Sequence, residues 1–355
     1  MTTLIIPCAG KSSRFPNIKP KWLFTHPDGK IMIEKAINPF LKNKKIKKKI
    51  ITITKEIDKK FNAKFLLKQM FGNKVDILIL KRQTTSASET VYKTIKKFNI
   101  KNQIIVKDCD NSFEIDSKFN IYGKNFIVFV DISKNPEISN VHQKSFIDLN
   151  NKKQIINIEE KKIISDKICV GLYSFHSAKD FEENYKNCRN KIKGSEIFVS
   201  LVVKNMLNNN NLFTCTEAKK YEDYGTFEDW LIIRKKYRTF FVDLDGVVFL
   251  NKGKYGKFNW NTKNQVIENN TNLLLKLNNN QSQIVFTSSR PEKNKNRIYK
   301  ELKRLGFKNF KLVLGLNHTQ RILVNDYSES NPNPSAISIN LERDANNLSS
   351  LIKSI

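Results

Sequence analysis

The sequence predicts an α/β protein with two domains, each built on its own sheet. Short apolar runs that read as buried strands alternate with amphipathic helical stretches, which is typical of parallel sheets covered by helices. The chain has 355 residues, enough for two ordinary domains. A second buried strand sequence, TFFVDLDGVVF, begins near Tyr237 after a join that reads as helical. We therefore expect domains over residues 1–236 and 237–355.

In the first domain, five short runs rich in Ile and Val read as buried strands. They lie at residues 3–7, 50–54, 75–80, 103–107 and 125–131. Apolar residues between them recur at helical spacing, which predicts helices that each turn one face to the sheet. The clearest faces consist of Ile33, Ala36, Ile37, Phe40 and Leu41, and of Val91, Ile95 and Phe98. This alternation predicts a Rossmann-like sheet that is mixed but mainly parallel, with helices on both faces.

The second domain follows the same alternation. After its first strand we expect a helix over 262–279, a strand in QIVFTSSR and a helix over 292–305. Three further strands are expected in KLVLG, RILVND and AISINL, followed by a last helix. A second Rossmann-like α/β sheet is therefore predicted.

Composition excludes several classes of protein. Hydrophobic residues make up 39% of the chain, enough for buried cores, and no segment reaches the roughly 18 apolar residues of a membrane helix. The first apolar run is too short for a signal peptide and has no cationic segment before it. The five cysteines form no CxxC pair, so we expect reduced, buried thiols. We predict a cytoplasmic protein without a membrane partner.

The net charge of +29 raises the question of nucleic-acid binding. Lysine, asparagine and isoleucine are abundant everywhere, as in NKKIKKKI and LKLNNNQ, so the charge does not mark one basic patch. We expect no nucleic-acid partner. The positive charge is still expected to attract anionic small substrates.

The first strand ends in LIIPCAGKSSRF, where an apolar run stops at a turn of small and cationic residues. A glycine turn after a strand lets backbone N–H groups point at an anion, and lysine and arginine add charge where a triphosphate would lie. The turn lacks the GxxxxGK[ST] spacing of a Walker P-loop. The predicted triphosphate-binding residues are Ala9, Gly10, Lys11, Ser12, Ser13 and Arg14.

Other polar motifs follow farther along the chain. They place Lys21 in KPKWL, Gln83, Ser86 and Glu89 in RQTTSASETV, Asp108 and Asp110 in IIVKDCDNSF, and Asp223 in KYEDYGTFEDW. Two carboxylates at strand ends, far apart in the sequence, suit an octahedral Mg²⁺ that also binds phosphates. The candidate ligands in these motifs are Asp108, Asp110 and Asp223.

Together these motifs resemble the sugar-phosphate nucleotidyltransferase family, whose opening motif is a glycine-rich turn ending in Arg and followed by Pro-Lys. The resemblance covers about residues 1–235. It implies that the turn ending in Arg14 holds a nucleoside triphosphate and that Lys21 steadies the transferring phosphate. It also implies that Asp110 and Asp223 hold Mg²⁺, with Asp108 as an alternative ligand. The segment containing Gln83, Ser86 and Glu89 is implied to surround the base and the acceptor.

The resemblance also implies the acceptor site and the reaction. INIEEKKIISDKICVGLYSF resembles the family's Glu-Lys stretch before VGLY, so Lys161 is expected to bind the acceptor's phosphate, with Lys162 as a neighbouring candidate. GSEIFVS places Glu196 near the acceptor's hydroxyl groups. The acceptor's phosphate oxygen would attack the α-phosphorus in line and release pyrophosphate. CTP is the favoured triphosphate, and a sugar or polyol phosphate is the expected acceptor.

FFVDLDGVVF places an aspartate at a strand end, a second two residues later, and then a glycine. This pattern resembles the haloacid dehalogenase-like (HAD-like) phosphatase superfamily. By resemblance, Asp243 is the nucleophile that becomes an aspartyl-phosphate, and Asp245 is the acid/base. Thr287 in IVFTSSR is implied to bind the phosphoryl oxygens. The implied Mg²⁺ ligands are Asp243, Asp245 and Asp326.

Two features depart from the superfamily's pattern. The lysine that usually precedes the last motif is missing from LGLNHTQRILVND, so Arg321 is the expected substitute and His318 the second candidate. The usual acidic neighbour of Asp326 is replaced by Asn325. Only 44 positions separate the nucleophile from the threonine, so no large cap domain is expected there.

The two halves together predict a bifunctional enzyme of nucleotide-activated sugar or polyol synthesis, similar to fusions in bacterial capsule and surface-polysaccharide biosynthesis. A phosphatase acting on the acceptor's only phosphate would destroy the transferase substrate, so we expect it to act on a bisphosphate or on a different phosphate. Two other functions stay open: a nucleic-acid end-processing phosphatase, and a nucleotidyltransferase with a decayed regulatory HAD module. The sequence also leaves open whether the chain forms a homo-oligomer.

Overall fold

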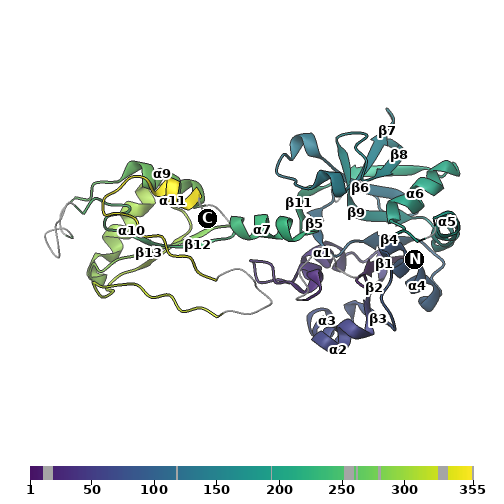
Figure 1. Cartoon of the computed structure of the whole chain (residues 1–355), viewed down its shortest axis with the longest axis horizontal. Helices are drawn as coiled ribbons and strands as arrows, with labels where there is room; N and C mark the ends of the chain where they lie inside the picture. The colour runs from purple at the N-terminus through teal and green to yellow at the C-terminus, as the bar shows by residue number, and fades with distance from the viewer. Residues whose placement is uncertain are drawn as a thin grey trace. The chain divides into compact units, whose positions relative to one another are not determined.

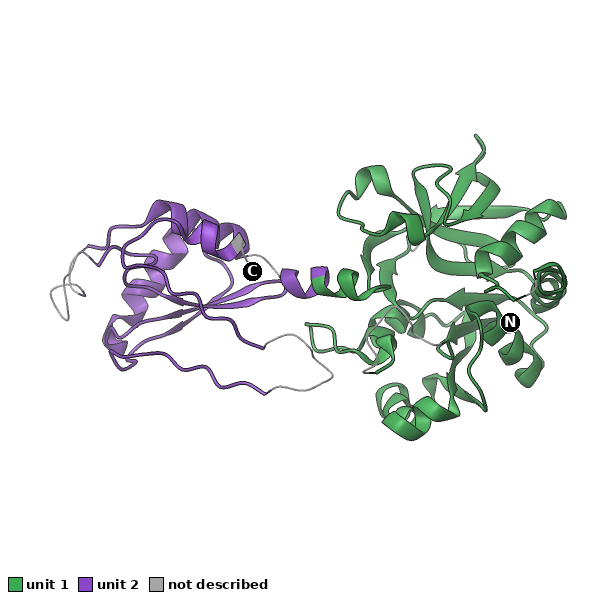
Figure 2. Ribbon diagram, in the orientation of Figure 1, with its two compact units in different colours: residues 1–231 green, residues 232–355 purple. Residues whose placement is uncertain are grey.

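The computed structural model describes residues 1–10, 19–116, 119–192, 194–251, 260, 263–278, 281–326 and 335–353. The chain forms two compact units, Met1–Leu231 (unit 1) and Ile232–Ile355 (unit 2), shown in Figure 2. The division falls within helix α7 (Phe227–Lys236), whereas the sequence analysis places the domain boundary after residue 236. The helical join that precedes the second strand sequence is confirmed by α7.

Unit 1 is built on a nine-stranded sheet with the strand order β3-β2-β1-β4-β9-β6-β10-β8-β7 (Figure 1). Its strands are β1 (Thr2–Pro7), β2 (Ile46–Thr54), β3 (Asp76–Leu80), β4 (Ile104–Lys107), β6 (Phe126–Asp131), β7 (Ser145–Leu149), β8 (Gln154–Glu160), β9 (Lys167–Phe175) and β10 (Phe213–Glu217). The five strands predicted for this domain are confirmed, and β2 is longer than expected.

The sheet is mixed as predicted, but its parallel part is smaller than expected. Strands β3, β2, β1 and β4 run parallel to one another, and β6 pairs in parallel with β10. Strand β9 runs antiparallel to both β4 and β6, and β7 and β8 form an antiparallel hairpin. The expectation of a mainly parallel sheet is therefore wrong for the second half, where β9 runs antiparallel to both of its neighbours and a short connection joins β7 to β8.

Helices cover both faces of this sheet, as predicted. Side chains of β1 alternate between two cores: Leu4 and Ile6 enter the first, and Ile5 enters the second. The first core includes residues of α1 (Met32–Leu41), α2 (Lys55–Phe61) and α3 (Ala63–Phe71), and the second includes residues of α4 (Ala87–Phe98), α5 (Ala178–Lys191) and α6 (Val199–Asn208). The apolar faces expected for α1 and α4 are buried, apart from their last members, Leu41 and Phe98, which are half-buried.

A small second sheet joins two distant motifs of unit 1. Strand β5 (Asn111–Glu114) pairs antiparallel with β11 (Lys219–Asp223), and the register sets Asp223 opposite Asn111. The backbone N–H of Tyr224 donates to the carbonyl oxygen of Asp110 at 2.8 Å. This pairing brings the ends of the DCDN and KYED motifs to one place.

Unit 2 contains a three-stranded parallel sheet in the order β12-β13-β14. Its elements are β12 (Thr239–Asp243), α9 (Glu268–Leu277), β13 (Gln283–Thr287), α10 (Lys295–Arg304), β14 (Phe310–Val313) and α11 (Leu348–Lys353). Leu244, Phe286 and Ile298 are fully buried in its core. The predicted α/β alternation of this region is confirmed up to β14.

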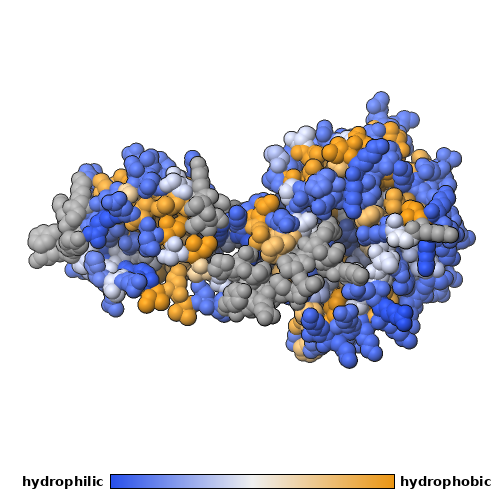
Figure 3. Space-filling view, viewed as in Figure 1, coloured by the Kyte–Doolittle hydropathy of each residue, from blue (hydrophilic) through white to orange (hydrophobic). Residues whose placement is uncertain are grey.

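The two strands expected in RILVND and AISINL are wrong, because residues 321–326 and 336–341 have no regular secondary structure. Ile322 is 78% exposed and Val324 is 90% exposed. A strand needs a neighbouring strand for its backbone hydrogen bonds, and neither segment has such a partner among the described strands. Figure 3 shows apolar side chains at the surface of this unit. The apolar pattern thus indicated that each segment could form a strand, but it did not indicate whether a neighbouring strand is present to pair with it.

The cysteines agree with the expectation of reduced, buried thiols. All five are unpaired, and four are buried, whereas Cys215 is only half-buried. In the described ranges, no helix combines the length and the apolar character that crossing a bilayer would require.

Candidate functional site

The turn after β1 lies beside the turn that precedes α4. Ala9 is fully buried, and its carbonyl oxygen accepts a hydrogen bond from the backbone N–H of Thr84 at 3.1 Å. The structure thereby brings together two motifs that the sequence analysis assigned to the nucleotide. Gly10 is described, but the predicted residues Lys11, Ser12, Ser13 and Arg14 lie outside the described residues. Their triphosphate-binding roles remain predictions.

Two of the residues expected near the base and the acceptor cap helix α4. Ser86 is its N-cap and accepts from the backbone N–H of Glu89 at 3.1 Å. Glu89 in turn accepts from the backbone and hydroxyl of Thr85 and pairs with Lys93 at 2.7 Å. Burial alone would raise the pKa of Glu89, but its bonds with Lys93 and Thr85 lower that pKa overall. Gln83 is exposed beside this cap, and ligand contacts of all three remain predictions.

Asp110 and Asp223 meet beside Gly225. A Cβ atom added to Gly225 would lie 3.0 Å from Asp223 Oδ1 and 3.6 Å from Asp110 Oδ2. The backbone N–H of Gly225 also donates to Asp223 Oδ1 at 2.9 Å. The missing side chain of Gly225 therefore leaves room at the point where the two carboxylates converge.

Each of these carboxylates is paired with a lysine. Lys21, in the short helix η1 (Lys21–Leu23), pairs with Asp110, and Lys144 pairs with Asp223. All four side chains are largely shielded, with exposed fractions of 12–13%. Lys21 was expected from its motif. Lys144 was not, because it lies in VHQKSFIDL, which matches no motif, and only the tertiary structure places it here.

The residues present fit a Mg²⁺ ion. Among the described residues no group of three or more His, Cys, Asp or Glu side chains could hold a metal. Mg²⁺ does not need such a group, because it commonly binds one or two carboxylates and completes its shell with water and phosphate oxygens. The carboxylate pair and the space beside Gly225 meet this requirement.

A buried lysine fixes the loop that carries Asp110. Lys107 is fully buried, and its Nζ donates to the carbonyl oxygen of Asp108 at 2.8 Å and to Asn111 Oδ1 at 2.6 Å. Burial lowers the pKa of Lys107 to about 8, although the charges of Asp108 and Asp110 act in the opposite direction. These bonds tie together the residues on either side of Asp110 in the DCDN loop.

Asp108, the alternative metal ligand, packs against Gly171 of the VGLY motif. Its backbone N–H donates to the carbonyl oxygen of Gly171 at 2.8 Å. Gly171 has a φ of +68°, and a Cβ atom there would lie 2.3 Å from Asp108 Oδ2 and 2.8 Å from Asp108 Cβ. An oxygen of Asp110 lies 3.6 Å from the position that a Cβ atom on Gly225 would take, beside Asp223 and Lys144.

Replacing Gly171 by Ala is expected to destabilise unit 1. An L-residue with this backbone conformation costs about 1–2 kcal/mol, and the clash with Asp108 adds to that cost. Gly123→Ala is the matched control, because Gly123 has a φ of +64° and nothing within 4 Å of the added atom. Thermal unfolding should show a larger decrease in Tm for Gly171→Ala than for Gly123→Ala. Equal decreases would contradict the close packing of Asp108.

The residues expected to bind the acceptor lie around the start of α6. Lys161 is exposed, and its Nζ lies 4.6 Å from the ring centroid of Phe198, the N-cap residue of α6. Lys162 and Glu196 are also exposed. Nearby, Glu160 accepts hydrogen bonds from the hydroxyl groups of Ser145 and Ser200. These acceptor roles remain predictions.

In unit 2, Asp243 and Asp245 flank the fully buried Leu244 at the end of β12. The Nε of Arg290 donates to both oxygens of Asp245 at 3.0 and 3.1 Å, and its Nη2 donates to Oδ1 at 2.5 Å. The hydroxyl of Ser288 donates to Asp245 Oδ2 at 2.9 Å. Arg290 is fully buried, so this is a shielded, multiply bonded ion pair.

Asp243 lies near the two cations that the sequence analysis proposed for the missing lysine. Burial, followed by the negative charge of Asp245, raises the pKa of Asp243 to about 6. The charges of Arg321 and His318 act in the opposite direction. Nη1 of Arg321 donates to the carbonyl oxygen of Thr319 at 2.6 Å, which holds its guanidinium in the loop after β14.

Two other predicted residues are placed differently around this pair, and Thr287 lies directly opposite Asp243 in the register of β12 and β13. The hydroxyl of Thr287 lies 3.4 Å from the carbonyl oxygen of Val242, and its neighbour Ser288 is the residue that reaches Asp245. The side chain of Asp326 is exposed and has no hydrogen bond or ion pair with any described residue. Ser288 and Arg290 were missed, although SSR directly follows the expected threonine. The roles of Thr287 and Asp326 remain predictions.

Arg290→Met is expected to destabilise unit 2 by about 3–5 kcal/mol, because removing one partner of a buried ion pair leaves the other charge uncompensated. Arg304→Met is the matched control, since Arg304 is an exposed arginine of the same unit, at the end of α10. Chemical denaturation monitored by circular dichroism measures the difference. Equal stability of the two variants would mean that the Arg290–Asp245 pair contributes nothing to folding.

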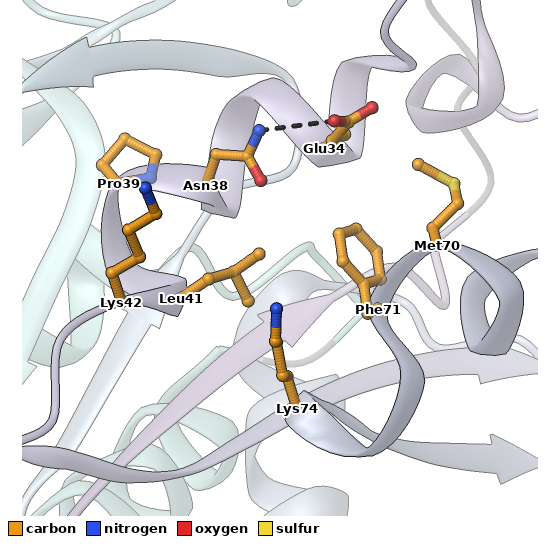
Figure 4. A pocket seen from close by; sticks show the side chains of 8 residues that line it. All are labelled: Glu34, Asn38, Pro39, Leu41, Lys42, Met70, Phe71 and Lys74. Carbon is orange, nitrogen blue, oxygen red and sulfur yellow. Dashed lines mark hydrogen bonds between the residues drawn. The ribbon is translucent and has the colours of Figure 1, made fainter.

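A separate cavity of about 560 Å³ lies in unit 1 beside the end of α1 and the end of α3 (Figure 4). It is lined by Glu34, Asn38, Pro39, Leu41, Lys42, Met70, Phe71 and Lys74. None of these residues belongs to the carboxylate site. We therefore assign the candidate site from the converging side chains and not from this cavity.

No protein-family model matches the sequence, and no curated protein matches it by sequence. Solved structures do match. A nucleoside-diphosphate-sugar pyrophosphorylase from Vibrio cholerae RC9 is similar over 65% of this chain and 99% of its own, with a TM-score of 0.55 and 18% identity. The inositol-1-phosphate CTP transferase from T. maritima is similar over 66% of this chain and 95% of its own, with a TM-score of 0.51 and 11% identity.

At these identities the similarity establishes a shared fold. The matched share of the chain equals that of unit 1, which holds residues 1–231 of 355. The nucleotidyltransferase-like fold expected from the motifs is thus confirmed over about 65% of the chain. The HAD-like fold of the second domain remains a prediction.

Proposed function

We propose that this protein is a Mg²⁺-dependent nucleotidyltransferase that transfers a nucleotidyl group from a nucleoside triphosphate to a sugar or polyol phosphate. The observation that carries the proposal is the convergence of Asp110 and Asp223 beside Gly225, with a lysine on each carboxylate. The fold shared with a sugar pyrophosphorylase and a CTP transferase supports it.

In the proposed reaction, an oxygen of the acceptor's phosphate forms a bond to the α-phosphorus of the triphosphate. The bond from that phosphorus to the bridging oxygen of the β-phosphate breaks, and pyrophosphate leaves with the electron pair. The chain needs to supply only position and charge for this step, since no covalent protein intermediate is required. Lys21 is proposed to neutralise the transferring phosphate, and the β1 turn with Arg14 the departing pyrophosphate.

Asp110 and Asp223 would hold the Mg²⁺. When bound, the ion supplies positive charge that offsets the charge of the phosphates and orients them. In its absence the two lysines satisfy the carboxylates. The phosphates of the substrates offer the same lysines alternative partners, because lysine ammonium groups bind phosphate oxygens well.

CTP is the proposed triphosphate, and the CTP transferase among the similar structures supports this choice. The product would be a nucleotide-activated sugar or polyol, the kind of donor that surface-polysaccharide assembly consumes. The experiment is to incubate the purified protein with Mg²⁺, each of the four nucleoside triphosphates and a panel of sugar and polyol phosphates, and to measure pyrophosphate. Absence of pyrophosphate with every combination would refute the proposal.

A second proposed activity is phosphate monoester hydrolysis by a HAD-like unit 2. The specific observation in its favour is the arrangement around Asp243: a neighbouring Asp245 held by Arg290 and Ser288, and two cations, Arg321 and His318, whose charges act on Asp243. Asp243 would attack phosphorus, and Asp245 would protonate the leaving alcohol. Its substrate would be a phosphate other than the one that the transferase uses.

Two other functions can be tested with the same purified protein. A nucleic-acid end-processing phosphatase would bind DNA or RNA with an affinity that falls steeply as salt rises. A decayed HAD module would leave pyrophosphate formation intact and show no phosphate release from any monoester. A titration with labelled oligonucleotides at two salt concentrations, and a phosphate-release assay on the same panel, separate these functions from the bifunctional enzyme.

A further inference from the structure

We propose that Lys144 binds the phosphate of the acceptor during nucleotidyl transfer, a role that sequence resemblance gives to Lys161. The inference rests on the proposed transferase function and adds one catalytic residue to it. It arises from three features of unit 1: the position of the Lys144 ammonium, the segment from which it reaches the carboxylates, and the different position of Lys161.

The ammonium of Lys144 lies at the centre of the candidate site. It pairs with Asp223. A Cβ atom added to Gly225 would lie 3.7 Å from Nζ of Lys144 and 3.6 Å from Asp110 Oδ2. Only 13% of the side chain is exposed. A charge that is shielded from water interacts more strongly with a phosphate than an exposed charge does.

The two lysines of the site come from different segments of unit 1. Lys21 follows the β1 turn, which is the proposed triphosphate side. Lys144 directly precedes β7, which stands last in the sheet order and also pairs with β9. In an in-line displacement, the attacking oxygen approaches opposite the leaving group. Pyrophosphate is proposed to leave toward the β1 turn, so the attacking phosphate needs a cation that does not belong to that turn, and Lys144 is such a cation.

Lys161 is positioned differently. Its Nζ lies over the Phe198 ring, and the residue is exposed. Its backbone N–H donates to the carbonyl oxygen of Lys144 at 2.9 Å. The Glu-Lys stretch therefore contributes to the site through its backbone, by fixing the main chain of Lys144.

The test compares Lys144→Met, Lys161→Met and Lys134→Met. Lys134 is an ion-paired lysine of the same unit, 3.2 Å from Glu217, whose side chain is 62% exposed. Losing a charged hydrogen bond typically costs about 10- to 100-fold in binding. Lys144→Met should raise the acceptor KM at least about tenfold. The triphosphate KM should stay within about twofold, and Lys161→Met should have a smaller effect on the acceptor KM.

A second readout does not depend on turnover. Calorimetric titration with inorganic phosphate, without Mg²⁺ or triphosphate, should show at least about tenfold weaker binding for Lys144→Met than for the wild type and for Lys134→Met. If Lys144→Met does not fold, as judged by circular dichroism, the comparison passes to Lys144→Arg and Lys144→Gln. The arginine variant should then retain phosphate binding, and the glutamine variant should lose it.

The outcomes separate this inference from the function on which it rests. A large rise in acceptor KM for Lys161→Met with none for Lys144→Met would overturn it and leave the transferase intact. If the wild type releases no pyrophosphate with any substrate pair, the proposed function fails, and the calorimetry still decides about Lys144. Unchanged phosphate binding by Lys144→Met would then overturn the inference as well.

Discussion

Asp110→Asn is expected to lower the rate of pyrophosphate release at least about 100-fold, the scale seen when a transition state loses a group that stabilises its charge. The asparagine keeps the shape of the side chain but removes one of the two carboxylates that converge beside Gly225. It also removes the charge that Lys21 pairs with, so the geometry of both partners changes. The measurement is the initial rate of pyrophosphate release with the best substrate pair at saturating Mg²⁺.

Asp76→Asn is the matched control for this variant. Asp76 begins β3 in the same unit, its side chain is 51% exposed, and it forms only a long pair with Lys48 at 3.8 Å. Its replacement should leave the rate unchanged. Wild-type turnover by Asp110→Asn, in a protein that folds normally, would remove Asp110 from the metal site and return Asp108 to consideration.

Asp243→Asn is expected to abolish phosphate release and to leave nucleotidyl transfer at the wild-type rate. An amide cannot act as the nucleophile that a carboxylate provides, so no aspartyl-phosphate can form. The two proposed sites belong to separate sheets, one in each unit, which is why the transferase should not respond. The measurement is the release of inorganic phosphate and of pyrophosphate by the same preparation.

Glu342→Gln serves as the control in unit 2, because Glu342 is an exposed carboxylate that we assign no role. It should keep both activities. Phosphate release by Asp243→Asn at the wild-type rate would show that another residue is the nucleophile. A wild-type protein that hydrolyses no monoester in the panel would favour a decayed regulatory module, and the bifunctional proposal would then be wrong.

The hydrogen bonds from Arg290 to Asp245 matter for the phosphatase reaction proposed for unit 2. Both oxygens of Asp245 accept hydrogen bonds from Arg290, and one also accepts from Ser288. A carboxylate held in this way has a fixed orientation, as an acid/base needs, because its geometry relative to the substrate then does not vary. The stability measurement on Arg290→Met therefore also tests a contact on which the proposed chemistry would depend.

Much of unit 1 was predictable because the relevant information is local. The spacing of Ile33, Ala36 and Ile37 defines a helix face within three turns of chain, and the structure buries that face. The run at residues 4–6 is apolar at every position, as expected for a strand covered by helices on both sides, and its side chains do enter two cores. Motif residues such as Lys21 and Asp223 were found because each lies in a short, recognisable stretch.

Other expectations failed where the outcome depended on distant segments. The apolar pattern of RILVND suits a strand, but no described strand pairs with it, and its apolar residues stay exposed. The antiparallel position of β9 between β4 and β6 was likewise not evident from its own sequence. Backbone pairing is a property of two segments, so neither sequence alone determines it.

By itself, the sequence determined that the chain alternates strands and helices, that two α/β units follow one another, and that carboxylates and cations gather at strand ends. The tertiary structure placed Asp110 beside Asp223, through the β5–β11 pairing and the room at Gly225, and brought Lys144 to Asp223. It likewise brought Ser288 and Arg290 to Asp245. The physical reason is range: periodicity acts over a few residues, whereas the side-chain contacts of Asp245 and Lys144 join residues that are 43 to 79 positions apart and become neighbours only when the sheets form.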